Sequence, residues 1–334
     1  MATMNPAARV KLSDVAARAG VSVATVSKVV NGRYGVSKDT IDLVQGVIDE
    51  LGYVGNLSAA SLRSASTNVL GILVADFEPY SAEIIKGAAT VTRGTAWELL
   101  AHAGGETHGW ERRSIARLGG TLIDGAVVVT PTTSEVNLIV PAVAIDPHYG
   151  PNQMPTVDAD SYGGATAAVK HLIGLGHSRI AFIGGRSELD SSRLRENGYR
   201  DAMATAGLDV PDAYVRESRY DPDAAEAIAL EMLALPERPT AIFAANDVTA
   251  IRVLGAARML GIRVPQDLSV VGFDDVPQAA LASPPLTTVR QPLGAMGEAA
   301  MHMLLDLLAG KERETHVRMP TELVVRASTA APSA

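Results

Sequence analysis

The stretch "GVSVATVSKVVNG", residues 20–32, decides how the N-terminal part of the chain folds. Four valines among the eight positions from Val23 to Val30 give a low intrinsic helix propensity. The apolar positions nevertheless keep helical spacing. Gly20 suits a left-handed helix stop, and Ser22 suits an N-cap. The stretch therefore predicts a short helix that neighbouring helices must stabilise.

Apolar positions on both sides of this stretch also repeat with a helical period. They predict one helix before Gly20 and a longer one that begins after Ser37 and ends near Gly52. Two short helices joined by a tight turn and followed by a packing helix predict a helix-turn-helix. The positions expected to face inward are Leu12, Val15, Ala16, Ala19, Val26, Val29, Val30, Ile41, Val44, Ile48 and Leu51.

Charge is distributed unevenly along the chain. Residues 1–38 hold six basic side chains and one acidic side chain, a net charge of +5, whereas the whole chain carries −8. The remainder therefore carries −13. A basic head on an acidic body is expected when one end of a protein meets phosphates. A solvated basic tail is the alternative interpretation.

Length and composition limit the class of protein. A chain of 334 residues is expected to form two or three domains. It contains no cysteine, which excludes disulfides and cysteine nucleophiles. No stretch is long and apolar enough to predict a membrane span, and the first residues lack a secretory pattern. We expect a cytoplasmic protein.

Several motifs in order resemble one family of bacterial proteins. "LSDVAARAGVSVATVSKVVNG" is followed by "VSKDTIDLVQGVIDELGYVGN", "SLRSASTNVLGILVAD", "VVGFDDVP" and "PPLTTVRQP". Together they resemble the lactose/galactose repressor family of transcription regulators over residues 10–327. The resemblance implies a helix-turn-helix domain at 1–54 and a hinge helix with linker at 55–67. An effector-binding and dimerisation core would follow at 68–330.

On this resemblance, residues 23–30 form the helix that enters the major groove of operator DNA. Val23, Ala24 and Lys28 match positions that face base edges. Val23 and Ala24 can offer only apolar contact, while Lys28 can donate to guanine. An exposed helix start without a DNA role is the alternative for Val23 and Ala24. Hydroxyl and amide groups suited to phosphates are supplied by Ser22, Thr25, Ser27 and Asn31.

The segment "NLSAASLR", residues 56–63, is too short to be a stable helix by itself. The family resemblance implies that it becomes ordered on the operator and that Leu62 wedges between base pairs in the minor groove. An ordinary linker helix whose Leu62 packs on the core is the alternative.

From Val69 onward, short apolar runs alternate with helical segments. This pattern predicts a parallel, doubly wound α/β arrangement. The resemblance implies a two-lobed core like that of type I periplasmic binding proteins, with three crossovers between the lobes. The N-lobe is expected at about 68–161 and 292–320, and the C-lobe at about 162–291 and 321–330.

Ligands in open α/β sheets bind beyond the carboxyl ends of the strands. Polar residues follow several of the predicted strands and match the family's effector contacts: Asp146, Ser191, Arg195, Asn246 and Asp274, with Tyr80, Ser81, Tyr220 and Gln291 as further candidates. Carboxylates, an amide, a hydroxyl and a guanidinium suit a sugar. Helix capping by Asn246 or Asp274 and an internal ion pair of Arg195 are the alternatives. Ser81 replaces an aromatic residue of some relatives, which disfavours a flat purine.

The predicted function is a homodimeric, sugar-responsive transcription repressor that binds double-stranded DNA and needs no cofactor. A regulator with a nucleoside or purine co-repressor, or a sugar-binding transport protein, is the alternative. Seven scattered histidines offer no metal-ligand spacing. We find no Walker loop and no G-x-S-x-G motif, so we expect neither a metal site nor an enzyme.

Overall fold

The computed structural model describes residues 10–30, 35–51, 53, 66–105, 107–133, 138–149, 154–311 and 314–333. The chain divides into two units, residues 1–67 and 68–334. Asn31, Leu62 and residues 55–65 of the expected hinge lie outside the described residues. Within the described ranges, no helix combines the length and apolar character needed to cross a membrane.

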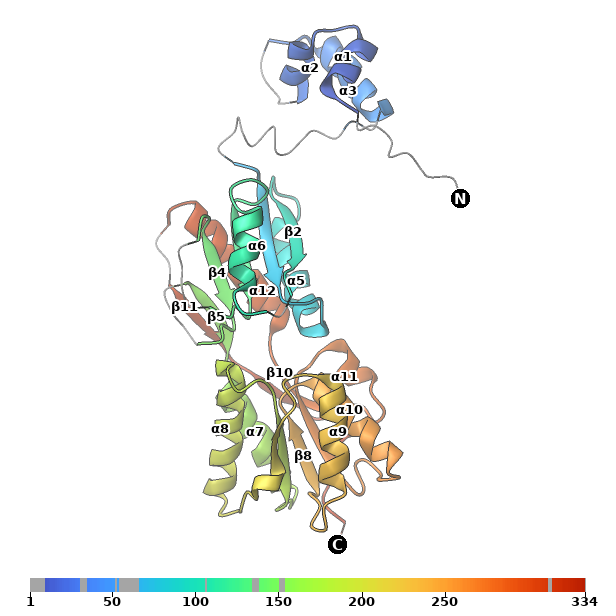
Figure 1. Cartoon of the computed structure of the whole chain (residues 1–334), viewed down its shortest axis with the longest axis vertical. Coiled ribbons are helices and arrows are strands. Elements are labelled where there is room, and N and C mark those ends of the chain that lie inside the picture. Colours follow the sequence, from blue (N-terminus) through green and yellow to red (C-terminus); the bar gives the residue numbers. More distant parts are fainter. Residues whose placement is uncertain are drawn as a thin grey trace. The chain divides into compact units, whose positions relative to one another are not determined.

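The first unit contains α1 (Leu12–Ala19), α2 (Val23–Val30) and α3 (Lys38–Leu51) (Figure 1). Gly20 ends α1 with a φ of 68°, as the sequence predicts. The Ser22 hydroxyl accepts a hydrogen bond from the Thr25 N–H at 3.1 Å, which caps α2. The predicted helix-turn-helix is therefore confirmed.

The core of this unit is small and corrects two of the predicted inward positions. Val15, Val26 and Val44 are fully buried in it. Val30 and Ile41 are instead 38% and 40% exposed. The buried face of α3 follows positions 44, 47, 48 and 51, so Ile41 lies one turn before the contact, whereas Val47 belongs to it.

The second unit has two α/β lobes, which confirms the predicted fold class (Figure 1). The N-lobe contains β1 (Val69–Val74), α5 (Pro79–Thr92), β2 (Glu98–Ala103), α6 (Trp110–Leu118), β3 (Gly125–Val129), β4 (Ala142–Ile145), β5 (Thr156–Ala159), α12 (Leu293–Leu308) and β11 (His316–Met319). The C-lobe contains α7 (Ser161–Gly174), β6 (Ile180–Gly184), α8 (Asp190–Thr205), η1 (Asp212–Tyr214), β7 (Val215–Glu217), α9 (Pro222–Leu233), β8 (Ala241–Ala244), α10 (Asp247–Met259), β9 (Ser269–Asp274), α11 (Pro277–Leu281), β10 (Thr287–Arg290) and β12 (Glu322–Val324).

Each lobe is a sheet between helices. The N-lobe sheet has the order β11-β5-β4-β3-β1-β2, and the C-lobe sheet has the order β12-β10-β9-β8-β6-β7. All pairs are parallel except β10 with β12. Helices α5 and α12 pack on one face of the N-lobe sheet and α6 on the other. Helices α9 and α10 pack on one face of the C-lobe sheet, and α7 and α8 on the other.

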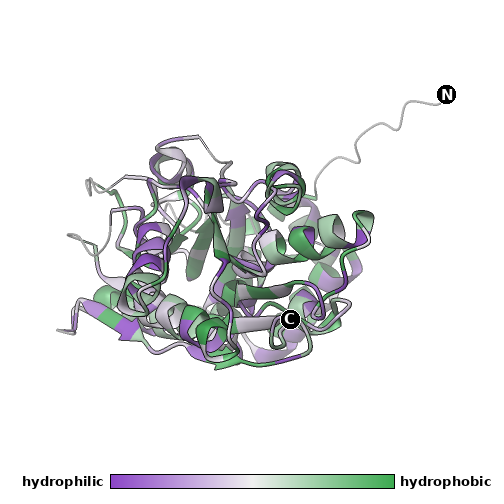
Figure 2. Ribbon diagram, turned by 90° about the horizontal axis from the view of Figure 1, so that it is seen from below, coloured by the Kyte–Doolittle hydropathy of each residue, from purple (hydrophilic) through white to green (hydrophobic). Residues whose placement is uncertain are grey.

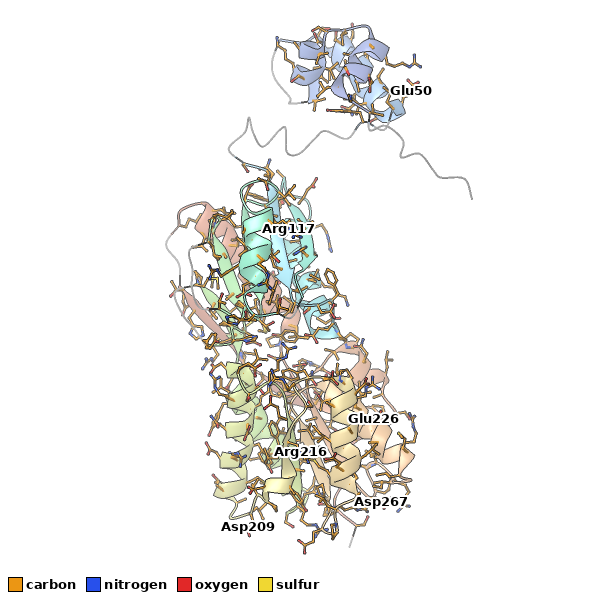
Figure 3. All side chains as sticks on the ribbon, in the orientation of Figure 1. Glu50, Arg117, Asp209, Arg216, Glu226 and Asp267 are labelled. Atoms are coloured by element: carbon orange, nitrogen blue, oxygen red, sulfur yellow. The ribbon has the colours of Figure 1, made fainter. Side chains whose placement is uncertain are left out.

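The chain crosses between the lobes three times, after β5, after β10 and after β11. Figure 2 shows that hydrophilic and hydrophobic residues alternate along the helices. Charged side chains such as Arg117, Asp209 and Arg216, labelled in Figure 3, are exposed. Apolar residues face the sheets and polar residues face water, as the alternating sequence pattern requires.

Trp110, for which the sequence offers no role, is 1% exposed and packs in the N-lobe core. Gly104 makes room for it, since an added Cβ would lie 2.3 Å from the indole ring. The sequence pattern does not predict some strands, such as β2, β7, β11 and β12. These are edge or short strands with few buried residues, so they lack a continuous apolar run.

Helices α5 and α12 approach each other closely through glycine. A Cβ on Gly87 would lie 1.9 Å from the Gly294 carbonyl oxygen, and one on Gly297 would lie 2.1 Å from the Ile84 carbonyl oxygen. These are backbone atoms, so the helices must separate before a larger residue can fit.

Gly87→Ala is therefore expected to lower the free energy of unfolding by about 1–3 kcal/mol, as overpacked cores do. Gly255→Ala is the matched control, because its Cβ would meet nothing closer than 3.9 Å. That substitution is expected to raise the free energy of unfolding by about 0.5–1 kcal/mol, since alanine favours helix interiors. Urea denaturation measures both, and equal stabilities would contradict the close-approach argument.

Candidate functional site

Helix α2 presents its candidate DNA-reading residues on the surface of the first unit. Val23 is 49% exposed, and Ser22, Ala24 and Lys28 are also exposed. Val26 faces the opposite way and is fully buried. Thr25 and Ser27 are partly buried beside the exposed positions. A helix that is buried on one face and carries small side chains on its exposed face can approach the floor of a major groove.

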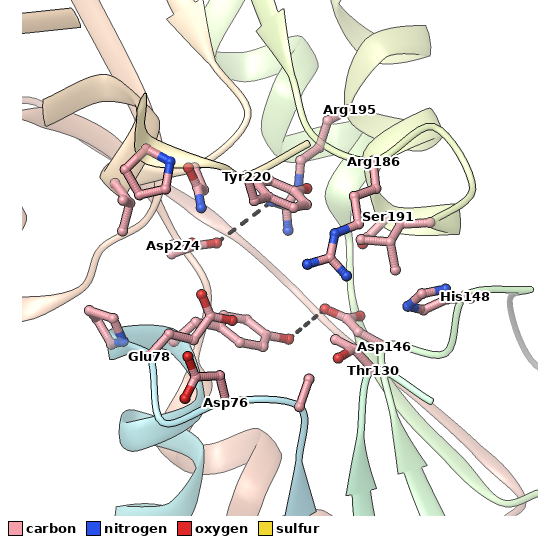
Figure 4. Close-up of a pocket in the computed structure, with 17 residues that line it drawn as sticks. Asp76, Glu78, Thr130, Asp146, His148, Arg186, Ser191, Arg195, Tyr220 and Asp274 are labelled. Carbon is pink, nitrogen blue, oxygen red and sulfur yellow. Dashed lines mark hydrogen bonds and ion pairs between the residues drawn. The ribbon is translucent and has the colours of Figure 1, made fainter. Parts of the chain in front are cut away.

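The second candidate site is a cleft of about 300 Å³ between the two lobes (Figure 4). It lies at the carboxyl ends of strands from both sheets, where parallel α/β proteins bind ligands. Asp146 follows β4, Asn246 follows β8, and Asp274 ends β9. All three line the cleft.

Arg195 of α8 is 3% exposed and lines the C-lobe side of the cleft. Its guanidinium lies 3.9 Å above the centre of the Phe273 ring. One terminal nitrogen donates to the Ala245 carbonyl at 2.6 Å and lies 3.7 Å from Asp274 Oδ1. This packing holds a positive charge in one orientation while its ion pair with Asp274 remains long.

Tyr80 and Asp146 form a polar pair on the N-lobe side. The Tyr80 hydroxyl donates to Asp146 Oδ2 at 2.7 Å (Figure 4). Tyr220 lines the C-lobe side, where Gly185 leaves room for its ring, since a Cβ on Gly185 would lie 2.0 Å from the ring. The cleft therefore combines two phenol rings with charged and amide groups.

Left-handed backbone conformations concentrate around the cleft. Seven described non-glycine residues have positive φ, and four of them line the cleft. They are Thr130, Asp146, Tyr220 and Asp274, with φ values of 50°, 46°, 64° and 112°. Such conformations are costly outside glycine and cluster where a fold positions functional groups.

Seven of the nine candidate effector residues meet in the cleft: Tyr80, Asp146, Ser191, Arg195, Tyr220, Asn246 and Asp274. Ser81 and Gln291 do not line it. Ser81 is 3% exposed and belongs to the buried residues of α5. Gln291 is also buried and donates to Asp274 Oδ1 at 2.7 Å, so it contacts a cleft residue from behind.

Asn246, and Asp275 beside Asp274, also have structural roles of the kind considered as alternatives, namely helix capping and ion pairing. The Asn246 side chain accepts a hydrogen bond from the Thr249 N–H at 2.9 Å and so caps α10. Asp275, next to Asp274, pairs with Arg290 at 2.7 Å and Arg326 at 2.6 Å. Asn246 combines capping with a place in the cleft, whereas the ion pairs of Asp275 fit a structural role.

The cleft also contains residues that the sequence analysis missed. Asp76 and Glu78 follow β1, Thr130 follows β3, and His148 comes two residues after Asp146. The same rule about strand ends would have found them, because each follows a predicted strand. Arg186 follows β6 in the same way, and the remaining lining residues are Ala75, Pro79, Leu189, Pro222 and Val248.

Burial changes the acidity of the cleft. It raises the pKa of Asp274 to about 7, although Arg195 and Gln291 oppose the change. Burial also raises the pKa of Asp146, again against Arg195. Burial together with the nearby Arg186 lowers the pKa of His148 to about 4, so this imidazole is neutral at physiological pH.

The pKa of Asp274 predicts a pH-dependent stability. In the unfolded chain Asp274 loses its proton near its ordinary value of 3.8, whereas the folded protein holds it to about pH 7. The contribution of Asp274 to the free energy of unfolding is therefore fully present below about pH 3.8. It is lost progressively as the pH rises from there to about 7. Asp274→Asn removes this dependence. The melting temperature of the variant minus that of the parent is expected to be more positive at pH 8 than at pH 5, measured by differential scanning fluorimetry.

Asp267→Asn is the control for this measurement. Hydrogen bonds from Arg263 lower the pKa of Asp267, so it is ionised in both states throughout this range. Its melting-temperature difference should be the same at pH 5 and pH 8. If the melting-temperature difference for Asp274→Asn were also the same at pH 5 and pH 8, it would contradict the raised pKa of Asp274.

Comparisons with known proteins agree with this architecture. The family model "Bacterial regulatory proteins, lacI family" matches residues 11–56, and "Periplasmic binding protein-like domain" matches residues 169–329. The HTH-type transcriptional repressor PurR of Vibrio campbellii is 34% identical over 326 residues, covering 94% of this chain and 97% of the relative.

Two solved structures extend the comparison. The complex of the transcriptional regulator CelR with cellobiose is 32% identical, with a TM-score of 0.71, and covers 96% of this chain and 100% of that one. The lac repressor dimer bound to operator and the anti-inducer ONPF is 27% identical, with a TM-score of 0.80, and covers 97% and 100%. The chain belongs to the lacI family of bacterial regulatory proteins and is a DNA-binding transcription regulator.

Proposed function

We propose that this regulator is a repressor that binds a pseudo-palindromic operator as a homodimer and is released by a sugar bound between its lobes. The observation that carries the effector assignment is the polar lining of the cleft, with donors and acceptors contributed by both lobes. Sugar hydroxyls both donate and accept hydrogen bonds, so they match a mixture of carboxylate, amide and guanidinium groups.

The DNA half of the proposal relies on α2. Its exposed side chains are small except for Lys28, so the helix backbone can come close to the bases while Lys28 donates to guanine. One such helix reads too few bases for useful specificity, which favours two copies on two half-sites. The similar lac repressor forms a dimer on its operator. Leu62 and Asn31 remain proposed DNA contacts.

The link between the halves is the angle between the lobes. A ligand bonded to Asp146 in the N-lobe and to Arg195 and Asp274 in the C-lobe favours one lobe angle over others. In a dimer, that angle sets the separation of the two hinge segments that precede Asn68. We infer that separated hinges cannot pair on the operator, so a bound sugar causes release.

A purine or nucleoside co-repressor is the second candidate. Tyr80 and Tyr220 both line the cleft, and aromatic rings can stack on a flat base. The similarity to the repressor PurR also favours this class. Ser81 does not line the cleft, so the absence of an aromatic side chain at this position does not disfavour a purine. The cellobiose bound by the similarly related CelR and the number of ionisable groups favour the sugar.

Lys28→Ala is expected to weaken operator binding by about 1–3 kcal/mol and to relax the preference for one base in each half-site, since it removes a base-edge donor. Mobility-shift titrations against operator variants measure both effects. Lys86→Ala is the control, because Lys86 is 67% exposed on α5 and pairs with Glu83. Unchanged affinity and base preference in Lys28→Ala would show that α2 does not read the groove through this residue.

Arg195→Met is expected to bind the operator normally but to lose its response to the effector. Methionine keeps apolar contact with Phe273 and removes every donor, and losing a charged hydrogen-bond partner costs about 1.5–3 kcal/mol of binding. In a thermal-shift screen of sugars and purines, a sugar should raise the melting temperature of the parent more than that of Arg195→Met.

Arg200→Met is the matched control, because Arg200 lies on the same helix but is exposed and pairs with Glu196 at 2.7 Å. It should respond like the parent. A sugar that stabilises Arg195→Met as strongly as the parent would contradict the assignment of Arg195. Stabilisation by purines alone would replace the sugar with the second candidate.

A further inference from the structure

The cleft continues into a second chamber of about 420 Å³. His148 and Arg186 line both chambers, so they mark the passage from the inner chamber already described to this outer one. Figure 4 shows these two residues on one side of the cleft, away from Glu78 and Asp274. The remaining outer lining residues are His108, Thr132, Tyr149, Glu188, Arg219 and Asp221.

Both lobes build the outer chamber. His108, Thr132 and Tyr149 come from the N-lobe, whereas Arg219 and Asp221 come from the loop before α9 in the C-lobe. A backbone hydrogen bond joins the lobes beside it, from the Asp190 N–H to the His148 carbonyl at 3.0 Å. This hydrogen bond ties the two lobes together beside the passage.

The combined volume of the two chambers exceeds what a ligand of one sugar ring needs. Pockets for small ligands span about 300–1,000 Å³, and the inner chamber alone lies at the lower limit of that range. The outer chamber adds about 420 Å³ to it, so the two chambers together offer more room than one sugar ring fills. A ligand that occupies both chambers must be elongated.

The outer chamber has the chemistry of a second sugar subsite. Tyr149 is 56% exposed, and an exposed phenol ring offers a flat apolar surface to the apolar face of a pyranose. His148 is neutral, so one ring nitrogen can donate to a hydroxyl and the other can accept. Arg219 forms ion pairs with Glu188 and with Glu217, the latter at 2.9 Å. These ion pairs hold charged hydrogen-bonding groups at the wall of the outer chamber.

The charged side chains that line the two chambers disfavour a phosphorylated ligand. The inner chamber is lined by four carboxylates, from Asp76, Glu78, Asp146 and Asp274, and by two guanidinium groups, from Arg186 and Arg195. The outer chamber has two guanidinium groups and two carboxylates. Neither chamber has an excess of positive charge with which to bind a phosphate.

We infer that the effector is an unphosphorylated oligosaccharide of at least two rings, with one ring in the inner chamber and the next against Tyr149 in the outer chamber. This inference rests on the proposed sugar-responsive function and specifies its ligand. It also implies that the regulator senses the sugar before the sugar is cleaved to single rings or phosphorylated.

Isothermal titration calorimetry with matched sugars tests the inference on the full-length chain. The probes are glucose, cellobiose and cellotriose; xylose, xylobiose and xylotriose; maltose; glucose 6-phosphate; and adenine, guanine and hypoxanthine. In one series the disaccharide is expected to bind at least tenfold more tightly than its monosaccharide, and glucose 6-phosphate is expected not to bind.

Tyr149→Ala should lower the affinity for that disaccharide at least fivefold and leave the affinity for the monosaccharide unchanged. Tyr149→Phe should retain the parent's affinity, because it keeps the ring. Tyr162→Ala is the control, because Tyr162 is 40% exposed on α7 and lines neither chamber. A merely structural role of Tyr149 would lower the affinities for both sugars together.

Three results would overturn the inference. Equal affinities for a monosaccharide and its disaccharide would remove the second subsite but leave the sugar-responsive regulator intact. Equal losses for both sugars in Tyr149→Ala would assign that residue a structural role. Binding of a purine alone, or of none of the probes, would overturn both the oligosaccharide and the proposed sugar effector.

Discussion

The buried guanidinium of Arg195 is the interaction on which the cleft depends. A buried cation is costly unless its surroundings compensate for it, and here the compensation comes from the Phe273 ring, the Ala245 carbonyl and nearby carboxylates. Asp274 Oδ1 lies 3.7 Å from this guanidinium, within ion-pair range but too far for a direct hydrogen bond. Ligand hydroxyls inserted between such groups gain hydrogen bonds to both of them.

The rest of the second unit keeps that constellation in place. Parallel sheets place the carboxyl ends of β4, β8 and β9 at the cleft, and left-handed backbone at Asp146 and Asp274 turns their side chains toward it. Helices α5 and α12 are locked together through Gly87 and Gly297. Two rigid lobes joined by three crossovers can change their mutual angle without losing their own cores.

Regulation then follows from which lobe holds which group. Tyr80 and Asp146 belong to the N-lobe, while Arg195, Tyr220 and Asp274 belong to the C-lobe. A ligand that bonds to both sets has a differential affinity for lobe angles, which is the physical requirement for an allosteric effector. In the proposed repressor, this difference in affinity drives release from the operator.

The sequence by itself determined the helix-turn-helix, the α/β character of the core and the polar residues at three strand ends, because helical spacing, apolar runs and strand-end chemistry are local patterns. Only the tertiary structure decided which candidates share one cavity. Ser81 is buried on α5 and does not line the cleft, and Gln291 contacts the cleft residue Asp274 without lining the cleft itself. The outer chamber with Tyr149 was likewise beyond the sequence, since it forms where loops from two lobes meet and no local pattern records that distance.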